Sequence, residues 1–524
     1  MTTLPVRPPY SQSELTSLYP ANLELQQVQI LLRYVLFFPI ELYTTPHGER
    51  TPISSRFKQT GLAIYWPYCE AASHFRDVIA TADGEWDSMH WKRRLETFGS
   101  DNSPLPARSQ SGSRDNICEP GQLTDLGRQT TLALGQRVRH LYVDQLGFLP
   151  GRLEAQTQGS IALRATPIQR ALESVQQTFT GLYPPSARSA GLPPHTITKR
   201  AMWEETLFPN EGGCPRFAEL AHAFAERTAQ LYNNGPEMTL LNKRIGKYMP
   251  KDSPTVKVDS HPRLSGIMDS INATRAHPND AATRLPSEFY EAEVIGAVDR
   301  VCTEEWFVGY QESNEYRKLG IGALVGDIAQ KMVERARRTP SASVSDDDGA
   351  FKLGLSGCHD TTIAATLTAL GGFDVQTDKW PNFTSNIAFE LFRRKDAPAS
   401  ASTSPSTKPS WWSTLFSSSP LASATTSTRT PLADLAPSDR SKLDDHFVRL
   451  RYNDRPLTLP YCAQPGKHME GDASFCTLAA FKEASDSFTP RDWRKECKMN
   501  LGTAGVKAVI EPPPGVGVGR MVVQ

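Results

Sequence analysis

Apolar residues recur every three or four positions in three stretches of the chain, the spacing that places them on one face of a helix. The first stretch predicts a helix that begins near Thr124, which can serve as its N-cap. Two further helices are predicted over about 167–182 and 323–338. Short apolar runs bounded by turn residues predict strands at Val28–Leu32, 351–355, Ile387–Phe392 and Phe447–Tyr452, and a fourth helix follows at about Thr361–Leu370. Strands that alternate with helices indicate an α/β fold with a largely parallel sheet.

Three other segments have a composition that does not favour packed elements. Residues 1–21 are rich in Pro and Ser and predict an irregular arm. Residues 395–440 are dominated by Ser, Thr, Pro and Ala, which is typical of a disordered linker. Residues 501–524 contain Pro-Pro-Pro and repeated Gly and predict a disordered tail. The strands on either side of 395–440 are therefore expected to belong to one sheet and to be joined by a long loop.

Composition and charge exclude several classes of protein. The 524 residues include 57 Lys and Arg and 57 Asp and Glu, so the formal net charge is zero. A general nucleic-acid binder would carry a basic excess, so we expect no nucleic-acid partner. The absence of an apolar run of about 18 residues predicts no transmembrane helix. The N-terminus lacks the apolar segment of a secretory signal, so a cytoplasmic location is expected, with a mitochondrial or secreted protein as the alternatives. Eight Cys are too few for a disulfide scaffold, and none forms a Cys-x-x-Cys pair.

The first segment with candidate chemistry runs from His47 to Pro52, with the sequence HGERTP. Gly48 beside His47 would allow a ligand to approach closely, because glycine has no side chain. Arg50 can supply a planar fork of donors for a phosphate group. A surface turn is an equally weighted alternative for this segment alone.

The second segment, Leu163–Pro167, leads into the predicted helix at 167–182. A helix N-terminus favours anions, and Arg164 lies just before this one. The alternative is that Arg164 pairs with a local carboxylate, and the segment taken alone favours this alternative. Arg170, inside the helix, is given such a structural role.

The third segment, Ser356–Thr362, follows a strand and opens a helix. This is where ligands bind in open α/β sheets. His359 can donate a hydrogen bond to an anion, and Asp360 can deliver a proton. The alternative role for Asp360 is that of a helix cap, which is about as well supported by this segment alone.

Together and in this order, the segments HGERTP, LRATPIQRALESVQQTFTGLYP and SGCHDTTIAATLTALGGF resemble the histidine acid phosphatase family. This family is the two-domain branch of the histidine phosphatase superfamily, and the chain is most similar to its lysophosphatidic-acid-phosphatase-like and fungal members. The resemblance covers about residues 22–497. It implies a phosphoglycerate-mutase-like α/β core, with a mostly parallel sheet flanked by helices, and a smaller helical cap. The core would comprise residues 22–185 and 290–500, and the cap residues 186–289 with parts of 60–120.

The resemblance also implies an activity, the hydrolysis of phosphomonoesters through a phosphohistidine, with no metal or cofactor. His47 would be the nucleophile, and Asp360 would act first as acid and then as base. The residues that bind the phosphate would be Arg33, Arg50, Arg164 and His359. The substrate would be a small-molecule or lipid phosphomonoester, since the neutral net charge gives no sign of the basic rim that a phytase needs.

The chain departs from the family pattern immediately before His47. The family has Arg at this position, but the chain has Pro46, and the nearest preceding arginine is Arg33. Removing Tyr34–Pro46 would give the uninterrupted motif QILLRHGERTP. Three explanations of this segment compete. It is a translated retained intron, a real loop that costs roughly 2 kcal/mol to close, or the result of a register shift in the first predicted strand. In the shifted register, Tyr34–Phe38 would replace the predicted strand and displace or bury Arg33. The alternative to an active enzyme is therefore an impaired member that binds phosphorylated ligands.

Overall fold

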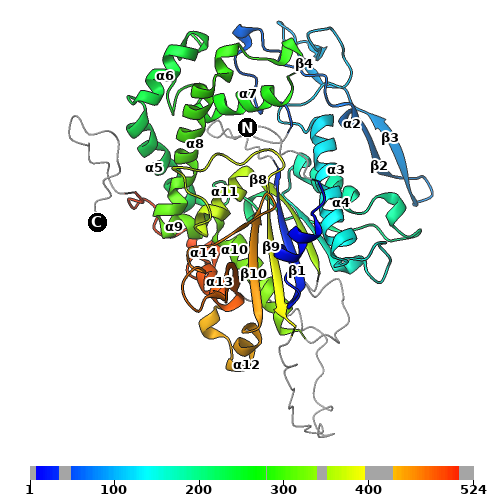
Figure 1. Ribbon diagram of the computed structural model, residues 1–524. Helices are drawn as coiled ribbons and strands as arrows, with labels where there is room; N and C mark the ends of the chain where they lie inside the picture. Colours follow the sequence, from blue (N-terminus) through cyan, green and yellow to red (C-terminus); the bar gives the residue numbers. More distant parts are fainter. Residues whose placement is uncertain (1–7, 35–48, 279, 339–350, 396–428, 507–524) are drawn as a thin grey trace, which may run out of the picture.

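The computed structural model describes residues 8–34, 49–278, 280–338, 351–395 and 429–506. Its core is a mixed sheet in the order β12-β13-β10-β9-β1-β8-β6-β7, with β11 paired to β10 (Figure 1). The core strands β1 (Leu23–Tyr34), β8 (Leu353–His359), β6 (Ile161–Ala165) and β7 (Ile197–Thr198) are parallel. Antiparallel strands extend the sheet beyond β1: β9 (Asn386–Arg394), β10 (His446–Tyr452), β11 (Arg455–Leu457), β12 (His468–Met469) and β13 (Asp472–Thr477). The direct pairing of β9 with β10 confirms that the strands flanking the long loop are neighbours.

Strand β1 lies in the middle of the sheet and is buried on both faces, as parallel central strands are. Val28 and Leu32 pack into the hydrophobic cluster on one face, and Leu31 packs into the cluster on the other. Val28 to Arg33 pair with Leu353 to Cys358 of β8 in an unbroken register. The predicted strand therefore keeps its place, contrary to the register-shift explanation of the Tyr34–Pro46 segment.

Helices cover both faces of the sheet (Figure 1). Helices α3 (Asp125–Arg139) and α4 (Gln169–Leu182) lie on one face, and α10 (Ala323–Arg337), α11 (Asp360–Ala369) and α13 (Leu478–Asp486) lie on the other. Helices α3 and α4 cross closely at Gly135, where a Cβ atom would lie 2.0 Å from the carbonyl oxygen of Thr178. The helices expected from apolar periodicity are thus confirmed, and Thr124 caps α3 by accepting from the Gly127 N–H.

A second group of helices lies beyond the carboxyl ends of the parallel strands (Figure 1). It contains α5 (Pro215–Tyr232), α6 (Pro236–Ile245), α7 (Leu264–Ala276) and α8 (Ala292–Glu312). Helix α8 packs against the other three, so the helical group continues past the expected boundary at residue 289.

The parts of 60–120 that were assigned to the cap contain two β-hairpins. These are β2 (His74–Ala80) with β3 (Trp86–Lys92), and β4 (Glu96–Phe98) with β5 (Pro104–Pro106). The first hairpin turns at Asp83-Gly84, where Gly84 has a φ of +84°. An Asp-Gly pair between runs of aromatic and β-branched residues is a strong hairpin signal.

Two segments expected to be irregular contain ordered elements. The arm holds helix α1 (Gln12–Leu18), because Ser11 and Glu14 form a capping box at its start. Residues 429–440, expected to be part of a disordered loop, include α12 (Pro437–Arg440) and contact the core. There the Leu432 N–H donates to Asp486 over 2.7 Å. Residues 396–428 and 507–524 lie outside the described residues.

Three disulfides join distant parts of the chain, although the cysteines are too few to replace a core. They are Cys69–Cys118, Cys214–Cys497 and Cys462–Cys476. The second links the start of α5 to the residue that follows α14 (Trp493–Glu496). Within the described ranges, no helix is long and apolar enough to cross a membrane.

Candidate active site

The candidate site lies where β1 and β8 end and α11 begins. Arg33 is the last residue but one of β1 and pairs with Cys358. His359 ends β8, and Asp360 is the first residue of α11. The side chains of Arg33, His359 and Asp360 are buried. Open α/β sheets bind ligands at this edge, and here the topology brings Arg33 together with the third sequence segment.

Asp360 is surrounded by hydrogen-bond donors. Its Oδ2 accepts from Arg33 Nη2 over 3.0 Å and from Trp380 Nε1 over 2.9 Å. Its Oδ1 accepts from the Thr361 N–H over 2.8 Å. Burial raises the pKa of Asp360 above its ordinary value, although the Arg33 charge and the Trp380 hydrogen bond oppose this. The carboxyl group therefore holds a proton to higher pH than an exposed aspartate does, as a general acid requires.

Arg50 reaches the site from a segment held against the start of α3. The Thr124 N–H donates to the carbonyl oxygen of Glu49 over 3.1 Å, and Gly127 lets the helix approach, because a Cβ there would lie 2.4 Å from that oxygen. Burial lowers the pKa of Arg50 to about 10, so it stays charged at neutral pH. Burial lowers the pKa of Arg33, and the nearby charges of Asp360 and Glu49 oppose this. Arg33 and Glu49, on either side of residues 35–48, therefore both lie at this site, while His47 itself is outside the described residues.

Asp269 of α7 holds Arg50 in place. Its carboxylate accepts hydrogen bonds from Arg50 Nη2, from Arg56 Nη1 over 3.0 Å and from the Ile53 N–H over 3.1 Å. The Asp269 side chain is fully buried. A buried carboxylate shared by two arginines links the helical group to the sheet edge and fixes the direction of the Arg50 guanidinium.

His359 is held by contacts with α11 and with the Phe208 ring. Its backbone N–H donates to Thr362 Oγ1 over 3.2 Å at the start of α11. Its ring meets the edge of the Phe208 ring at a centroid distance of 5.5 Å. These contacts fix the imidazole at the same sheet edge as Arg33 and Asp360.

Arg164 makes its described contacts with a different set of residues. It lies on β6, and its Nη2 donates to Glu205 over 2.5 Å and to Thr206 over 3.4 Å. Burial lowers the pKa of Arg164, and the charges of Glu205, Arg200 and Asp327 also act on it. The described contacts therefore correspond to the local carboxylate pairing considered for this segment.

Arg170 takes the place beside Arg50 instead. It is the second residue of α4 and is buried, and burial together with the Arg50 charge lowers its pKa. Within the described part of the chain, its Nε and Nη2 have no hydrogen-bond partner. The charges of Asp269 and Asp360 also act on it. Two buried guanidinium groups beside one another, one of them with unused donors, form a site suited to an anion.

The position of Arg170 in the first turn of α4 also suits an anion site. A cation in the first turn of a helix is opposed by the positive end of the helix dipole. A bound anion would offset this repulsion. Arg170 meets this description, whereas Arg164 precedes the helix on a strand.

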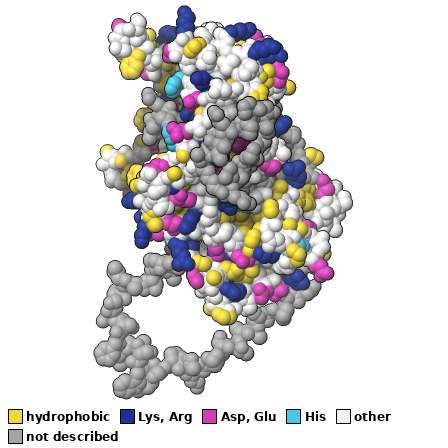
Figure 2. Space-filling model, turned by 90° about the vertical axis from the view of Figure 1, so that its left-hand side faces the viewer, with side chains coloured by type: hydrophobic (Ala, Val, Ile, Leu, Met, Phe, Trp, Pro, Cys, Tyr) yellow, Lys and Arg dark blue, Asp and Glu magenta, His cyan; other side chains and the backbone are white. Residues whose placement is uncertain are grey.

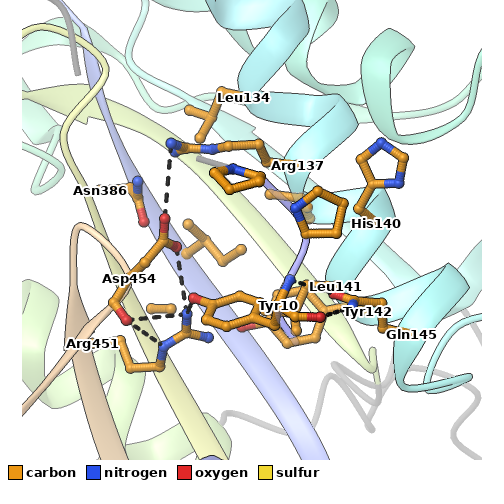
Figure 3. A pocket seen from close by; sticks show the side chains of 15 residues that line it. Tyr10, Leu134, Arg137, His140, Leu141, Tyr142, Gln145, Asn386, Arg451 and Asp454 are labelled. Atoms are coloured by element: carbon orange, nitrogen blue, oxygen red, sulfur yellow. Dashed lines mark hydrogen bonds and ion pairs between the residues drawn. The ribbon is translucent and has the colours of Figure 1, made fainter. Parts of the chain in front are cut away.

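A cavity on the described surface lies away from this site (Figure 3). It is lined by the arm at Tyr10, by α3 and by β9 and β10, and none of the site residues above contributes to it. The Arg451 guanidinium donates to Tyr10 Oη and to Asp454 Oδ1, and it also binds buried Glu390. The polar side chains that line this cavity are thus largely paired with one another. This pairing indicates a structural role, in which they hold the N-terminal arm against the sheet. Within the described ranges, no three His, Cys, Asp or Glu side chains gather as a metal site would require.

Comparisons with known proteins agree with this geometry. The model of the histidine phosphatase superfamily (branch 2) matches residues 45–414. The protein called "Probable acid phosphatase" in Schizosaccharomyces pombe is 34% identical over 485 residues, which cover 92% of this chain and 95% of that protein. Human lysophosphatidic acid phosphatase type 6 is 27% identical over 277 residues, 53% of this chain and 58% of that protein.

A solved structure shows the same fold. The phytase of Hafnia alvei in complex with tartrate is 13% identical, with a TM-score of 0.50 over 91% of this chain and 99% of that chain. The family model spans most of the sequence, and the yeast relative matches it almost from end to end. These comparisons confirm the resemblance drawn from the three motifs: the chain is a histidine acid phosphatase of the histidine phosphatase superfamily, branch 2.

Proposed function

We propose that this chain hydrolyses phosphomonoesters through a phosphohistidine formed on His47, with Asp360 as the general acid. The observation that carries the proposal is the buried, hydrogen-bonded Asp360 at the same sheet edge as Arg33, Arg50 and Arg170. Preorganised cations stabilise the charge of a transferring phosphoryl group. A carboxyl with a raised pKa can protonate the oxygen that leaves.

The reaction has two steps. In the first, a ring nitrogen of His47 forms a bond to phosphorus, the phosphorus–oxygen bond of the ester breaks, and the Asp360 proton passes to the leaving oxygen. In the second, the Asp360 carboxylate takes a proton from water, whose oxygen attacks phosphorus as the phosphorus–nitrogen bond breaks. The products are an alcohol and inorganic phosphate, and His47 and protonated Asp360 are regenerated.

The phosphate would be bound by arginines that approach from three elements. Arg33 comes from β1, Arg50 from the segment before α3, and Arg170 from the first turn of α4. His359 is placed to donate to the same group. Arg164 remains a proposed contact, and its direct pairing with Glu205 supports a structural role better than a binding one.

An acidic pH optimum follows from the proposed role of Asp360. The first step needs this carboxyl in its protonated form. Burial raises its pKa, so activity is present below the raised pKa and is lost as pH rises through it. The acidic limb would be set by deprotonation of the nucleophile and of the substrate.

We propose that the substrate carries a single phosphate, with a lipid phosphomonoester preferred to a multiply phosphorylated inositol. The human relative described above is named a lysophosphatidic acid phosphatase. The formal net charge of the chain is zero. On the face in Figure 2, the visible basic and acidic side chains are intermixed, which does not suit a polyanionic ligand.

The three disulfides support an oxidising compartment as the location of the protein. Disulfides form and persist in secreted and lumenal proteins and are rare in the cytosol. In two of the three disulfides, the paired cysteines are separated by 49 and by 283 positions in the sequence. This weighs against the cytoplasmic expectation and in favour of the secreted alternative.

The test is turnover of p-nitrophenyl phosphate at acidic pH, about pH 5. The wild-type chain is compared with His47→Ala, and the expected result is activity that the variant lacks. No activity above that control would sink the hydrolase proposal. The chain would then be the alternative, an impaired member whose inserted segment separates Arg33 from His47. Such a protein would bind inorganic phosphate, which would raise its Tm, but it would hydrolyse no phosphate ester.

A further inference from the structure

We infer that Trp380 is a positioning residue for Asp360. Its hydrogen bond to Oδ2 leaves the transferred proton on Oδ1. The inference rests on the proposed role of Asp360 as general acid. It adds a residue from outside the three sequence motifs, and it assigns different tasks to the two oxygens of one carboxyl group.

The oxygen Oδ2 is occupied by two groups that can only donate. Arg33 Nη2 lies 3.0 Å away and Trp380 Nε1 lies 2.9 Å away. Neither a guanidinium nor an indole N–H can accept a hydrogen bond. A hydroxyl hydrogen on Oδ2 would compete with these two donors for the same lone pairs, so this oxygen takes the carbonyl role when Asp360 is protonated.

The oxygen Oδ1 is free to take the hydroxyl role. Among the described residues, its one donor is the Thr361 N–H, over 2.8 Å. A protonated carboxyl oxygen keeps acceptor capacity beside its O–H, so the Thr361 bond and the acidic proton are compatible. The proton therefore leaves from Oδ1 to the oxygen of the departing alcohol, and the water of the second step returns its proton to Oδ1.

Trp380 is held rigidly enough to make this assignment. The side chain is buried, and its ring lies 4.6 Å from the Phe307 ring and 6.1 Å from the Trp306 ring of α8. Its backbone N–H donates to Asp299 Oδ1 of the same helix over 3.3 Å. Packing against helix α8 thus fixes the indole that donates to the general acid.

The hydrogen bond also stabilises the ionised form of Asp360. Among the described residues, the other charged or titratable groups that face Asp360 are Arg33 from β1, Arg50 from the segment before α3, Arg170 from α4, and the Cys358 thiol and His359 ring from β8. All of them remain when only the indole N–H is removed. Loss of that N–H raises the pKa of Asp360, since the carboxylate loses a donor while its burial persists.

The test compares Trp380→Phe with wild type, and Trp306→Phe serves as a matched control from the same aromatic cluster. For Trp380→Phe we expect kcat for an alkyl phosphate to fall about 10- to 100-fold, the effect of one hydrogen bond to a charged group. The fall for p-nitrophenyl phosphate should be much smaller, because this leaving group needs little protonation. The alkaline limb of kcat should move upward by about one pH unit, while Trp306→Phe changes neither quantity.

Equal losses for the two substrates with an unmoved alkaline limb would overturn the inference and leave Trp380 a packing residue. Failure of the proposed function is a separate result: Asp360→Asn would then affect both substrates equally. A measurement on the wild-type chain does not depend on Trp380→Phe folding. The infrared carbonyl band of protonated Asp360, identified by its loss in Asp360→Asn, should lie at the low frequency of a carbonyl that accepts two hydrogen bonds. A band at the frequency of an unbonded carbonyl would contradict the inference.

Discussion

Replacing Arg170 by Met should lower catalysis and raise stability at the same time. Arg170 is buried beside Arg50, and its Nε and Nη2 have no hydrogen-bond partner in the described part of the chain. Burying a charge without a partner is unfavourable. The arrangement is therefore costly for the folded protein and becomes favourable only when a phosphate is bound.

The size of both effects follows from these contacts. Removal of one preorganised donor to a reacting group lowers kcat by about 10²–10³. Replacing a poorly compensated buried charge by an apolar side chain of similar volume should raise the free energy of unfolding by ~1–3 kcal/mol. Arg164→Met is the matched control, because it leaves the fully buried Glu205 without its cation and should lower stability instead.

Three measurements check this prediction. They are kcat/KM for p-nitrophenyl phosphate, the inhibition constant of inorganic phosphate, and the urea midpoint of unfolding. Phosphate should also raise the Tm of wild type more than that of Arg170→Met, because a ligand stabilises in proportion to its affinity for the folded state. A destabilised Arg170→Met variant with an unchanged phosphate inhibition constant would refute the reasoning and make Arg170 a structural residue.

Three further perturbations have definite expected outcomes. Asp269→Asn should lower the free energy of unfolding by about 3–5 kcal/mol, because Arg50 and Arg56 lose a buried partner, and urea denaturation checks this. The Cys214→Ser, Cys497→Ser double variant should lose about 2–5 kcal/mol, and an oxidised and a reduced wild-type sample with equal Tm would contradict the role of this disulfide. Deletion of Tyr34–Pro46 should raise phosphatase activity at acidic pH by placing Arg33 directly before His47, and unchanged or lower activity would favour a real loop around an intact site.

The regular parts of the fold were predictable from the sequence because their signals are local. Helices α3, α4, α10 and α11 have long apolar stripes or a strand–turn–helix boundary, and β8, β9 and β10 are short apolar runs. The hairpin of β2 and β3 was missed because its strands are exposed on both faces, so burial leaves no alternating pattern. Helix α1 was missed because Pro and Ser were given more weight than its capping box.

The candidate site was predictable only where a motif carries it. Arg50, His359 and Asp360 stand in recognisable segments, and β1 carries Arg33 to the same edge. The choice between Arg164 and Arg170 depends on which way a strand residue and a helix residue face, and this is set by packing that sequence spacing does not show. Asp269 and Trp380 lie far from the motifs in sequence and reach the site only through tertiary contacts.

The central claim is that this chain transfers a phosphoryl group to His47. The most direct test is to mix the protein with a labelled phosphomonoester, quench the reaction in alkali, in which a phosphohistidine survives, and map the label after tryptic digestion. The claim predicts label on the peptide Tyr34–Arg50, which contains His47, and none in the His47→Ala protein. Turnover with no label on that peptide, or label that persists in His47→Ala, would contradict it.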